Sequence, residues 1–377
     1  CKITSTSLLD HHGMLVHSGH PGGKTLSMAY FDSTDVYYEP LEPNGWVEVF
    51  GLPKDHSVQM SSSESVIPSE IDEDWTISLE ENSNDFYSFS TRAEDIIYSS
   101  TSTGMLFAVS SVDKEILWSK EIGSHPTKPV VTDHRLFVGS DKGLHVFDLG
   151  WMTMNTKPIG AVTSGPVVFD ELVVVGSEKQ KVSAINQDSG VIRWQINVDG
   201  APYISNVEDN VLIIASEQTV FAVNISDGNI LWTTELDGLL TSCPYQKDGQ
   251  VYVGSWDTNL YALDQRSGSI VWMIDTGWGI ESTPVVVNDL VIFGSHDQHV
   301  YAADVESGEI VWKVLCQAAI HTDPVIWQNS VLVGSDDGRL YRIKVSSGEV
   351  LWCFAPGDTI DDATRNYETT PIRSSVA

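Results

Sequence analysis

The stretch ALDQRSGSIVW at residues 262–272 decides the fold, because it recurs three more times in nearly the same form. The other copies are AINQDSGVIRW at 184–194, AVNISDGNILW at 222–232 and AADVESGEIVW at 302–312. Each copy follows the pattern Ala-x-(Asp/Asn)-x-x-x-Gly-x-x-x-Trp. Self-similarity at a fixed period of about 40 residues is the sequence signature of a repeat protein.

Two further marks show that each repeat is longer than this motif. A small pair ends an apolar run at Ser99-Ser100, Gly139-Ser140, Gly176-Ser177, Ala215-Ser216, Gly254-Ser255, Gly294-Ser295 and Gly334-Ser335. Another strand is predicted to open each unit near Pro129, Pro166, Ser205, Pro244, Pro284, Pro324 and Pro371. Apolar runs with turn residues about every ten positions predict four antiparallel strands per unit. Such a sheet cannot bury both faces alone, so radial stacking into a β-propeller is expected.

The motif resembles the tryptophan-docking motif of propellers built from pyrroloquinoline-quinone (PQQ) type repeats. The resemblance covers about residues 85 to 355 and implies that each Trp packs between adjacent blades against the small Ala, while the Asp or Asn and the Gly shape the turn. The residues that match are Ala184 with Trp194, Ala222 with Trp232, Ala262 with Trp272, and Ala302 with Trp312, joined by Trp118 and Trp352 in partial copies. The unit at 129–160 is the weakest, because it has no Trp at the expected place.

The two ends of the chain predict how the ring closes. Residues 369–373 begin another unit, whereas 14–18 and 25–31 have the pattern of second and third strands without a first. Residues 75–79 have the pattern of a fourth strand. We therefore predict one domain over residues 1–377: an all-β, eight-bladed propeller of four-stranded antiparallel blades, in which N- and C-terminal strands share one blade. Closure of this kind removes exposed sheet edges.

An acidic insertion at residues 33–74 interrupts the composite blade. It contains ten acidic residues against the single Lys54, together with four aromatic residues. Long insertions in repeat proteins are usually loops on one face. Both a partner-binding segment and a mobile decoration fit this composition.

The charge balance limits the partners. The 377 residues include 21 basic and 52 acidic ones, for a net charge of −31. Such a surface repels nucleic acids and anionic membranes, so neither is expected as a partner. No run of 18 or more apolar residues predicts a transmembrane helix.

The four cysteines form no zinc-binding or disulfide-rich pattern. Cys316 and Cys353 follow equivalent tryptophans in neighbouring repeats, so both a disulfide and buried free thiols fit their spacing. Position 1 is Cys rather than Met, and a polar segment follows it. A bacterial lipoprotein begins this way after signal cleavage, so Cys1 is a candidate for lipid attachment; a trimmed boundary would look the same.

Signals for catalysis and metal binding are weak. Quinoprotein dehydrogenases of the resembled family carry adjacent cysteines, a calcium ion and a catalytic Asp, and this chain has no Cys-Cys pair and no matching cluster by motif. A hydrolase motif is likewise absent from the sequence. We therefore assign no catalytic, cofactor or metal residues. His11, His12, His17 and His20 near the start are interpreted as an accidental cluster rather than a metal site. Asp358, Asp361, Asp362 and Glu368 near the end are interpreted as a solvated acidic loop rather than a Ca²⁺ site, because the EF-hand spacing is absent.

The loops from each Trp to the next repeat emerge on one side of the propeller, a face that commonly binds ligands. They contain the candidate binding residues Trp278, Glu281, His321 and Asp323, with Tyr203 and Tyr245 nearby. Ordinary packing at the ends of the blades is the competing interpretation. The glycosylation sequon at 224–226 overlaps the docking motif and is interpreted as structural.

These features favour a non-catalytic scaffold. Within the family, the chain is similar to outer-membrane lipoproteins that assist the assembly of β-barrel membrane proteins. The resemblance implies a monomeric extracytoplasmic protein, periplasmic or secreted, that binds protein partners, with a membrane β-barrel assembly protein among them, and that needs no cofactor. Two other functions stay open: a PQQ-dependent dehydrogenase-like enzyme, and an extracellular propeller that binds a small ligand or a sugar.

Overall fold

The computed structural model describes residues 2–4, 12–18, 26–32, 88–101 and 103–354. Every regular element within these residues is a β-strand, which confirms the all-β prediction. Among the described residues, accordingly, no helix is long and apolar enough to cross a lipid bilayer. Residues 88–354 form seven four-stranded antiparallel sheets, called blades below, in which each strand pairs with its neighbours in the sequence.

The first blade contains β4 (Ser88–Ala93), β5 (Ile96–Thr101), β6 (Met105–Ser110) and β7 (Ile116–Glu121), and the second contains β8 (Val130–Val131), β9 (Arg135–Ser140), β10 (Gly143–Asp148) and β11 (Thr153–Lys157). The third blade contains β12 (Val167–Phe169), β13 (Leu172–Ser177), β14 (Lys181–Asn186) and β15 (Ile192–Asn197). The fourth blade contains β16 (Tyr203–Glu208), β17 (Val211–Ser216), β18 (Thr219–Asn224) and β19 (Ile230–Glu235). The last three have these strands: β20 (Tyr245–Lys247), β21 (Gln250–Gly254), β22 (Asn259–Asp264) and β23 (Ile270–Asp275); β24 (Val285–Val287), β25 (Leu290–Gly294), β26 (His299–Asp304) and β27 (Ile310–Leu315); β28 (Val325–Trp327), β29 (Ser330–Gly334), β30 (Leu340–Lys344) and β31 (Val350–Phe354).

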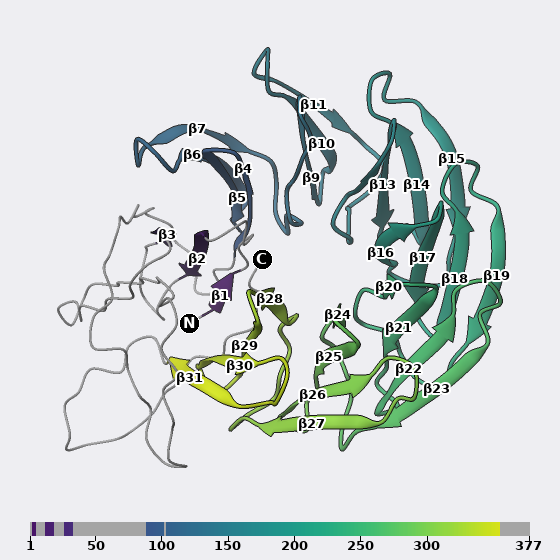
Figure 1. The fold of residues 1–377 in the computed structure, drawn as a ribbon. Helices are drawn as coiled ribbons and strands as arrows, with labels where there is room; N and C mark the ends of the chain where they lie inside the picture. Colours follow the sequence, from purple (N-terminus) through teal and green to yellow (C-terminus); the bar gives the residue numbers. More distant parts are fainter. Residues whose placement is uncertain (1, 5–11, 19–25, 33–87, 102, 355–377) are drawn as a thin grey trace.

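The blades stand around a common centre, with the first strand of each nearest the centre and the fourth at the rim (Figure 1). The second and third strands are apolar on both faces because neighbouring blades cover both faces; all six residues of β13 are buried. The fourth strands are largely exposed, and in β19 the more buried residues alternate with exposed ones. This gradient from core to rim is typical of radially stacked sheets.

The hydrophobic core is divided among the interfaces between blades. In β17, Ile213 and Ala215 pack towards Val251 and Val253 of the next blade, whereas Leu212 and Ile214 belong to the cluster shared with the preceding blade. Alternate residues of one strand therefore serve two different interfaces, as the two-residue period of a β-strand requires. Six such clusters link the seven blades in chain order.

The tryptophans of the motif lie at these interfaces. Trp194 stands opposite Ala184 in the same blade, and its indole N–H donates a hydrogen bond of 2.7 Å to the carbonyl oxygen of Ile225 in the next blade. The ring covers Gly228, where an added Cβ would lie 2.7 Å from ring atoms. The left-handed φ of +76° at Gly228 is a second reason for glycine. The same arrangement is repeated by Trp232 with Gln265 and Gly268, Trp272 with Val305 and Gly308, and Trp312 with Val345 and Gly348.

The partial copies dock differently. Trp118 lies opposite Ala108 and stacks on Phe147 of the next blade, with ring centroids 5.6 Å apart. Asn155 stands opposite Val146, where a tryptophan would be expected. Arg342 replaces the small residue opposite Trp352 and places its guanidinium 4.3 Å from the ring centroid of Trp327.

The N-terminal sheet has three strands in the order β1 (Lys2–Thr4), β2 (His12–Ser18) and β3 (Leu26–Asp32). The predicted second and third strands are present as β2 and β3, but the prediction that their first strand comes from the C-terminus is wrong for the residues described: β1 pairs with β2, Lys2 opposite Ser18. β1 and β2 also contact β4, so this sheet lies beside the first blade.

The structure also tests the predictions for the cysteines and the sequon, whereas other predictions concern residues that it does not describe. Cys316 is a buried free thiol, so it forms no disulfide with Cys353, which packs against the same cluster. Asn224 of the sequon accepts a hydrogen bond from the N–H of Ser226 within the turn. The acidic insertion at 33–74, the predicted strands at 75–79 and 369–373, Cys1 and the acidic cluster at 358–368 lie outside the described residues.

Candidate functional site

A chain of polar and aromatic side chains crosses three consecutive blades where two equivalent positions of the repeat meet. One position follows the Gly-Ser pair at the end of the second strand and holds Trp256, His296 and Asp336. The other precedes the first strand by about four residues and holds Thr241, Glu281 and His321. Because these positions recur in every blade, successive side chains are brought next to one another along the face.

Glu281 is the centre of this chain. Its Oε2 lies 2.9 Å from Nε2 of His296 and 2.7 Å from Nδ1 of His321. The other nitrogen of His321, Nε2, lies 3.2 Å from Oδ2 of Asp336. The two imidazole rings meet edge to face, with centroids 4.0 Å apart. Two histidines therefore share one carboxylate oxygen, and a second carboxylate holds the far side of one of them.

The charges of the cluster stabilise one another. Hydrogen bonds from His296 and His321 lower the pKa of Glu281 to about 2, although burial acts in the opposite direction. Burial opposes the charge on His321, but hydrogen bonds with Asp336 and Glu281 outweigh it and raise its pKa to about 9. The two carboxylates therefore favour the protonated form of His321.

One tryptophan packs on the cluster, and a second lies near it in the sequence. Trp256 packs edge to face on His296, with centroids 4.9 Å apart, and its indole N–H donates to Thr241 Oγ1 at 2.9 Å. Trp278 lies three residues before Glu281 in the loop between β23 and β24, and its side chain is 59% exposed. The loops and turns of this face thus carry two large aromatic side chains, and one of them contacts the cluster.

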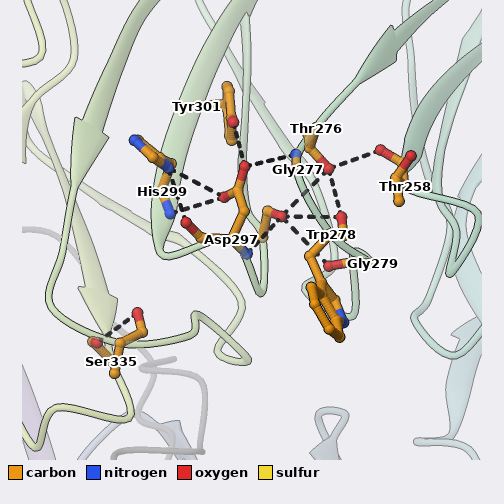
Figure 2. Close-up of polar contacts among 11 residues, drawn as sticks. Thr258, Thr276, Gly277, Trp278, Gly279, Asp297, His299, Tyr301 and Ser335 are labelled. Atoms are coloured by element: carbon orange, nitrogen blue, oxygen red, sulfur yellow. Dashed lines mark hydrogen bonds and ion pairs between the residues drawn. The ribbon is translucent and has the colours of Figure 1, made fainter.

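The loop that carries Trp278 is held by its main chain. The carbonyl oxygen of Trp278 accepts hydrogen bonds from Thr276 Oγ1 at 2.6 Å and from Ser295 Oγ at 3.2 Å. Figure 2 shows the neighbouring Asp297, which accepts from the N–H of Gly277 at 2.9 Å and from the hydroxyl of Tyr301 at 2.5 Å. Burial disfavours the charge on Asp297, but these hydrogen bonds outweigh it and lower its pKa. Trp278 is therefore exposed on a loop with a fixed backbone.

The structure places the predicted binding residues in two environments. Glu281 and His321 are in direct contact, and Trp278 lies in the same loop as Glu281. Asp323 is occupied differently: its Oδ1 accepts a hydrogen bond of 2.6 Å from the N–H of Thr283 in the preceding blade. Its charge also raises the pKa of Lys128, although burial dominates and lowers that pKa overall.

Sequence reasoning missed His296, Asp336 and Trp256. It followed only the loops from each Trp to the next repeat, whereas these three residues lie in turns between second and third strands. Their signal was the position after each Gly-Ser pair, which holds Trp, His and Asp in three successive repeats. At the corresponding position two earlier blades have Glu178 and Glu217.

Chemically, the cluster suits two roles. Two imidazole nitrogens and a carboxylate oxygen can ligate a transition-metal ion, and their ligand atoms all lie within 4.8 Å of one another. Exposed tryptophans are also typical of protein-binding surfaces.

The comparisons with known proteins agree with the fold. A family model described as "Outer membrane protein assembly factor BamB", of the PQQ type, matches residues 72–273 and 260–372. The chain belongs to this family. The resemblance to PQQ-type propellers that the motif indicated is thereby confirmed.

Two solved structures are similar to this BamB-family chain. The crystal structure of BamB from Moraxella catarrhalis superimposes with a TM-score of 0.59 at 16% sequence identity, covering 71% of this chain and 87% of that one. The computationally designed Ika8 protein gives a TM-score of 0.65 at 16% identity, covering 76% of this chain and 88% of its own. At such identities these likenesses concern the fold alone. No curated protein matches the sequence.

Proposed function

We propose that this chain is a non-catalytic propeller scaffold that binds protein partners outside the cytoplasm. The family match over residues 72–372 carries the proposal, because the family is described by a role in outer-membrane protein assembly. Assembly of β-barrel membrane proteins, or another extracytoplasmic complex, is the setting proposed. Fold alone would not support a function, since one fold serves many.

The partner-binding surface that we propose is the face carrying Trp256, Trp278 and Leu239. Their side chains are 38%, 59% and 47% exposed, on loops and turns of neighbouring blades. Large aromatic side chains contribute most of the binding energy in many protein interfaces. The hydrogen bonds that fix the Trp278 loop reduce the conformational entropy lost on binding, which favours affinity.

The negative charge of the chain suits a partner with a basic surface. At a net charge of −31, a partner with a basic surface would be attracted over a long range and at high rates of association. Affinity for the partner should consequently fall as the salt concentration rises.

We also propose that the ring closes with eight blades, the N-terminal sheet being the eighth. The indole N–H of Trp352 is buried and has no hydrogen-bond partner within the part of the chain that the structure describes. In the four preceding blades the corresponding N–H donates to the next blade. A further blade after β31 would supply that acceptor, and β1 and β2 already contact β4 on the other side.

The test is affinity purification of the tagged chain from its native host in mild detergent. We expect co-purification of a β-barrel assembly protein, and loss of most of it with Trp278→Ala but not with Met273→Ala, whose exposed side chain lies on β23 at the rim. A bound quinone, seen by absorption, or a bound sugar, seen by mass spectrometry, in place of a protein would contradict the scaffold. The same spectra would show lipid on Cys1, and light scattering would test the monomer of 41.4 kDa.

A further inference from the structure

The repeat departs from its own pattern at the junction between blades β24–β27 and β28–β31. The two positions that meet there hold Glu281 and His296, then His321 and Asp336. In the preceding blade the same two positions hold Thr241 and Trp256, and in blade β12–β15 they hold Thr163 and Glu178. Two histidines, a glutamate and an aspartate thus stand at positions that hold threonine, tryptophan and glutamate in the two other blades.

Three of the four have ligand atoms directed at one small region. Glu281 Oε2 is 2.9 Å from His296 Nε2 and 2.7 Å from His321 Nδ1. Zinc binds imidazole nitrogen at about 2.0–2.1 Å and carboxylate oxygen at about 2.0–2.2 Å, so tetrahedral ligands stand about 3.3 Å apart. Each imidazole nitrogen would move about half an ångström away from the Glu281 oxygen, a movement that side-chain rotation can supply.

Asp336 supplies a second, independent observation. Its Oδ2 lies 3.2 Å from Nε2 of His321, on the side of the ring opposite Glu281. Histidines that ligate metals almost always donate their other N–H to a carboxylate, a carbonyl or water, which fixes the tautomer and orients the ring. With Nδ1 of His321 as the ligand atom, Asp336 occupies the position of that supporting carboxylate.

The ligand side chains are partly exposed to solvent, and their neighbours hold them in place. The side chains of His296, His321 and Glu281 are 11%, 20% and 30% exposed. Trp256 packs against the ring of His296 and limits its rotation. An ion can therefore enter from solvent, and water can complete its coordination, as in zinc sites with two histidines and one glutamate.

We propose that Glu281, His296 and His321 bind one divalent transition-metal ion, for which Zn²⁺ is the best match, and that Asp336 orients His321. Two nitrogen ligands and one oxygen ligand favour a borderline metal over Ca²⁺ or Mg²⁺, which prefer oxygen alone. The ion would join two adjacent blades across their interface. This proposal does not depend on the scaffold function.

The test is zinc binding by the purified full-length chain after chelator treatment and dialysis. Isothermal titration with ZnCl₂ and metal analysis after gel filtration should give one more equivalent for the wild type than for His296→Ala or His321→Ala. Bound Co²⁺ should show visible ligand-field bands that both variants lose. If the wild type and both variants bind the same number of zinc ions and the wild type shows no cobalt bands, the proposal is overturned. Zinc bound only by other surface histidines would give that result.

Two further variants separate ligation from folding. His299→Ala removes a histidine that lies 3.3 Å from Asp297 but belongs to no three-ligand group among the described residues, so it should keep the full stoichiometry. Asp336→Asn should keep the site and weaken zinc binding by about 10- to 100-fold, because it alters only the supporting carboxylate. Equal zinc affinity in Asp336→Asn and the wild type would contradict its orienting role. Circular dichroism spectra check that each variant is folded.

Discussion

The docking of tryptophan onto a glycine turn of the next blade makes a quantitative prediction. Gly228 and Gly249 both have left-handed φ angles, +76° and +79°. A Cβ added at Gly228 would lie 2.7 Å from the Trp194 ring, whereas a Cβ added at Gly249 would meet nothing within 4 Å. Alanine at either position therefore pays the same backbone cost, but only alanine at Gly228 also disturbs a contact between blades.

The expected magnitudes follow from this difference. The left-handed conformation costs an alanine about 1–2 kcal/mol. Inserting a methyl group into a close-packed contact costs about 1–3 kcal/mol more. Gly249→Ala should thus lower the free energy of unfolding by about 1–2 kcal/mol, and Gly228→Ala by about 2–5 kcal/mol.

Equilibrium urea unfolding followed by far-ultraviolet circular dichroism measures both values. The same excess should appear at Gly308 and Gly348, where an added Cβ would lie 2.8 and 2.9 Å from Trp272 and Trp312. If Gly228→Ala and Gly249→Ala destabilise the protein equally, the tryptophan does not pack closely on the neighbouring blade, and the reasoning fails.

Three other perturbations have expected outcomes. Trp312→Phe leaves the Val345 carbonyl without its 2.7 Å hydrogen bond and should lower the free energy of unfolding by about 1–3 kcal/mol beyond the loss of packing. Trp327→Phe should cost less, because the buried N–H of Trp327 has no partner among the described residues. Urea titration of both variants measures the difference. His145 lies between the hydroxyls of Ser140 and Thr156, and burial lowers its pKa below the ordinary 6.5. The contribution of neutral His145 to stability is therefore present above pH 6.5 and is lost as the pH falls through the folded-state pKa. The free energy of unfolding should fall more steeply below pH 6.5 in the wild type than in His145→Gln, and parallel curves would refute this. Asp297→Ala should speed amide hydrogen exchange in the loop at 276–281, while Asp304→Ala, which disturbs a turn on another part of the blade, should not.

The blades could be predicted because their sequence determinants are local and repeated. A proline precedes β8, β12, β20, β24 and β28 by one residue, and the Gly-Ser pair ends the second strand. Blade β8–β11 lacks the tryptophan, and only its spacing from the neighbouring repeats indicated it. β1 is three residues long and carries no motif, so its pairing with β2 could not be recognised from sequence.

The candidate site was predicted in part for a related reason. Glu281 and His321 precede first strands, in the loops that the repeat places on the proposed binding face. His296 and Asp336 reach the same face from a different turn, and their approach depends on how neighbouring blades are stacked. That stacking is a tertiary property, which a single repeat does not encode. Asp323, only two residues beyond His321, binds a main-chain N–H of the preceding blade instead.

Site-specific photo-crosslinking in native cells tests the scaffold function most directly. A photoreactive amino acid placed at position 278 should form a covalent adduct with one protein of the outer-membrane assembly machinery. The same amino acid at position 273, where Met273 is 61% exposed on the rim, should form none. Adducts from position 273 alone, or from neither position, would contradict a partner-binding face built around Trp278.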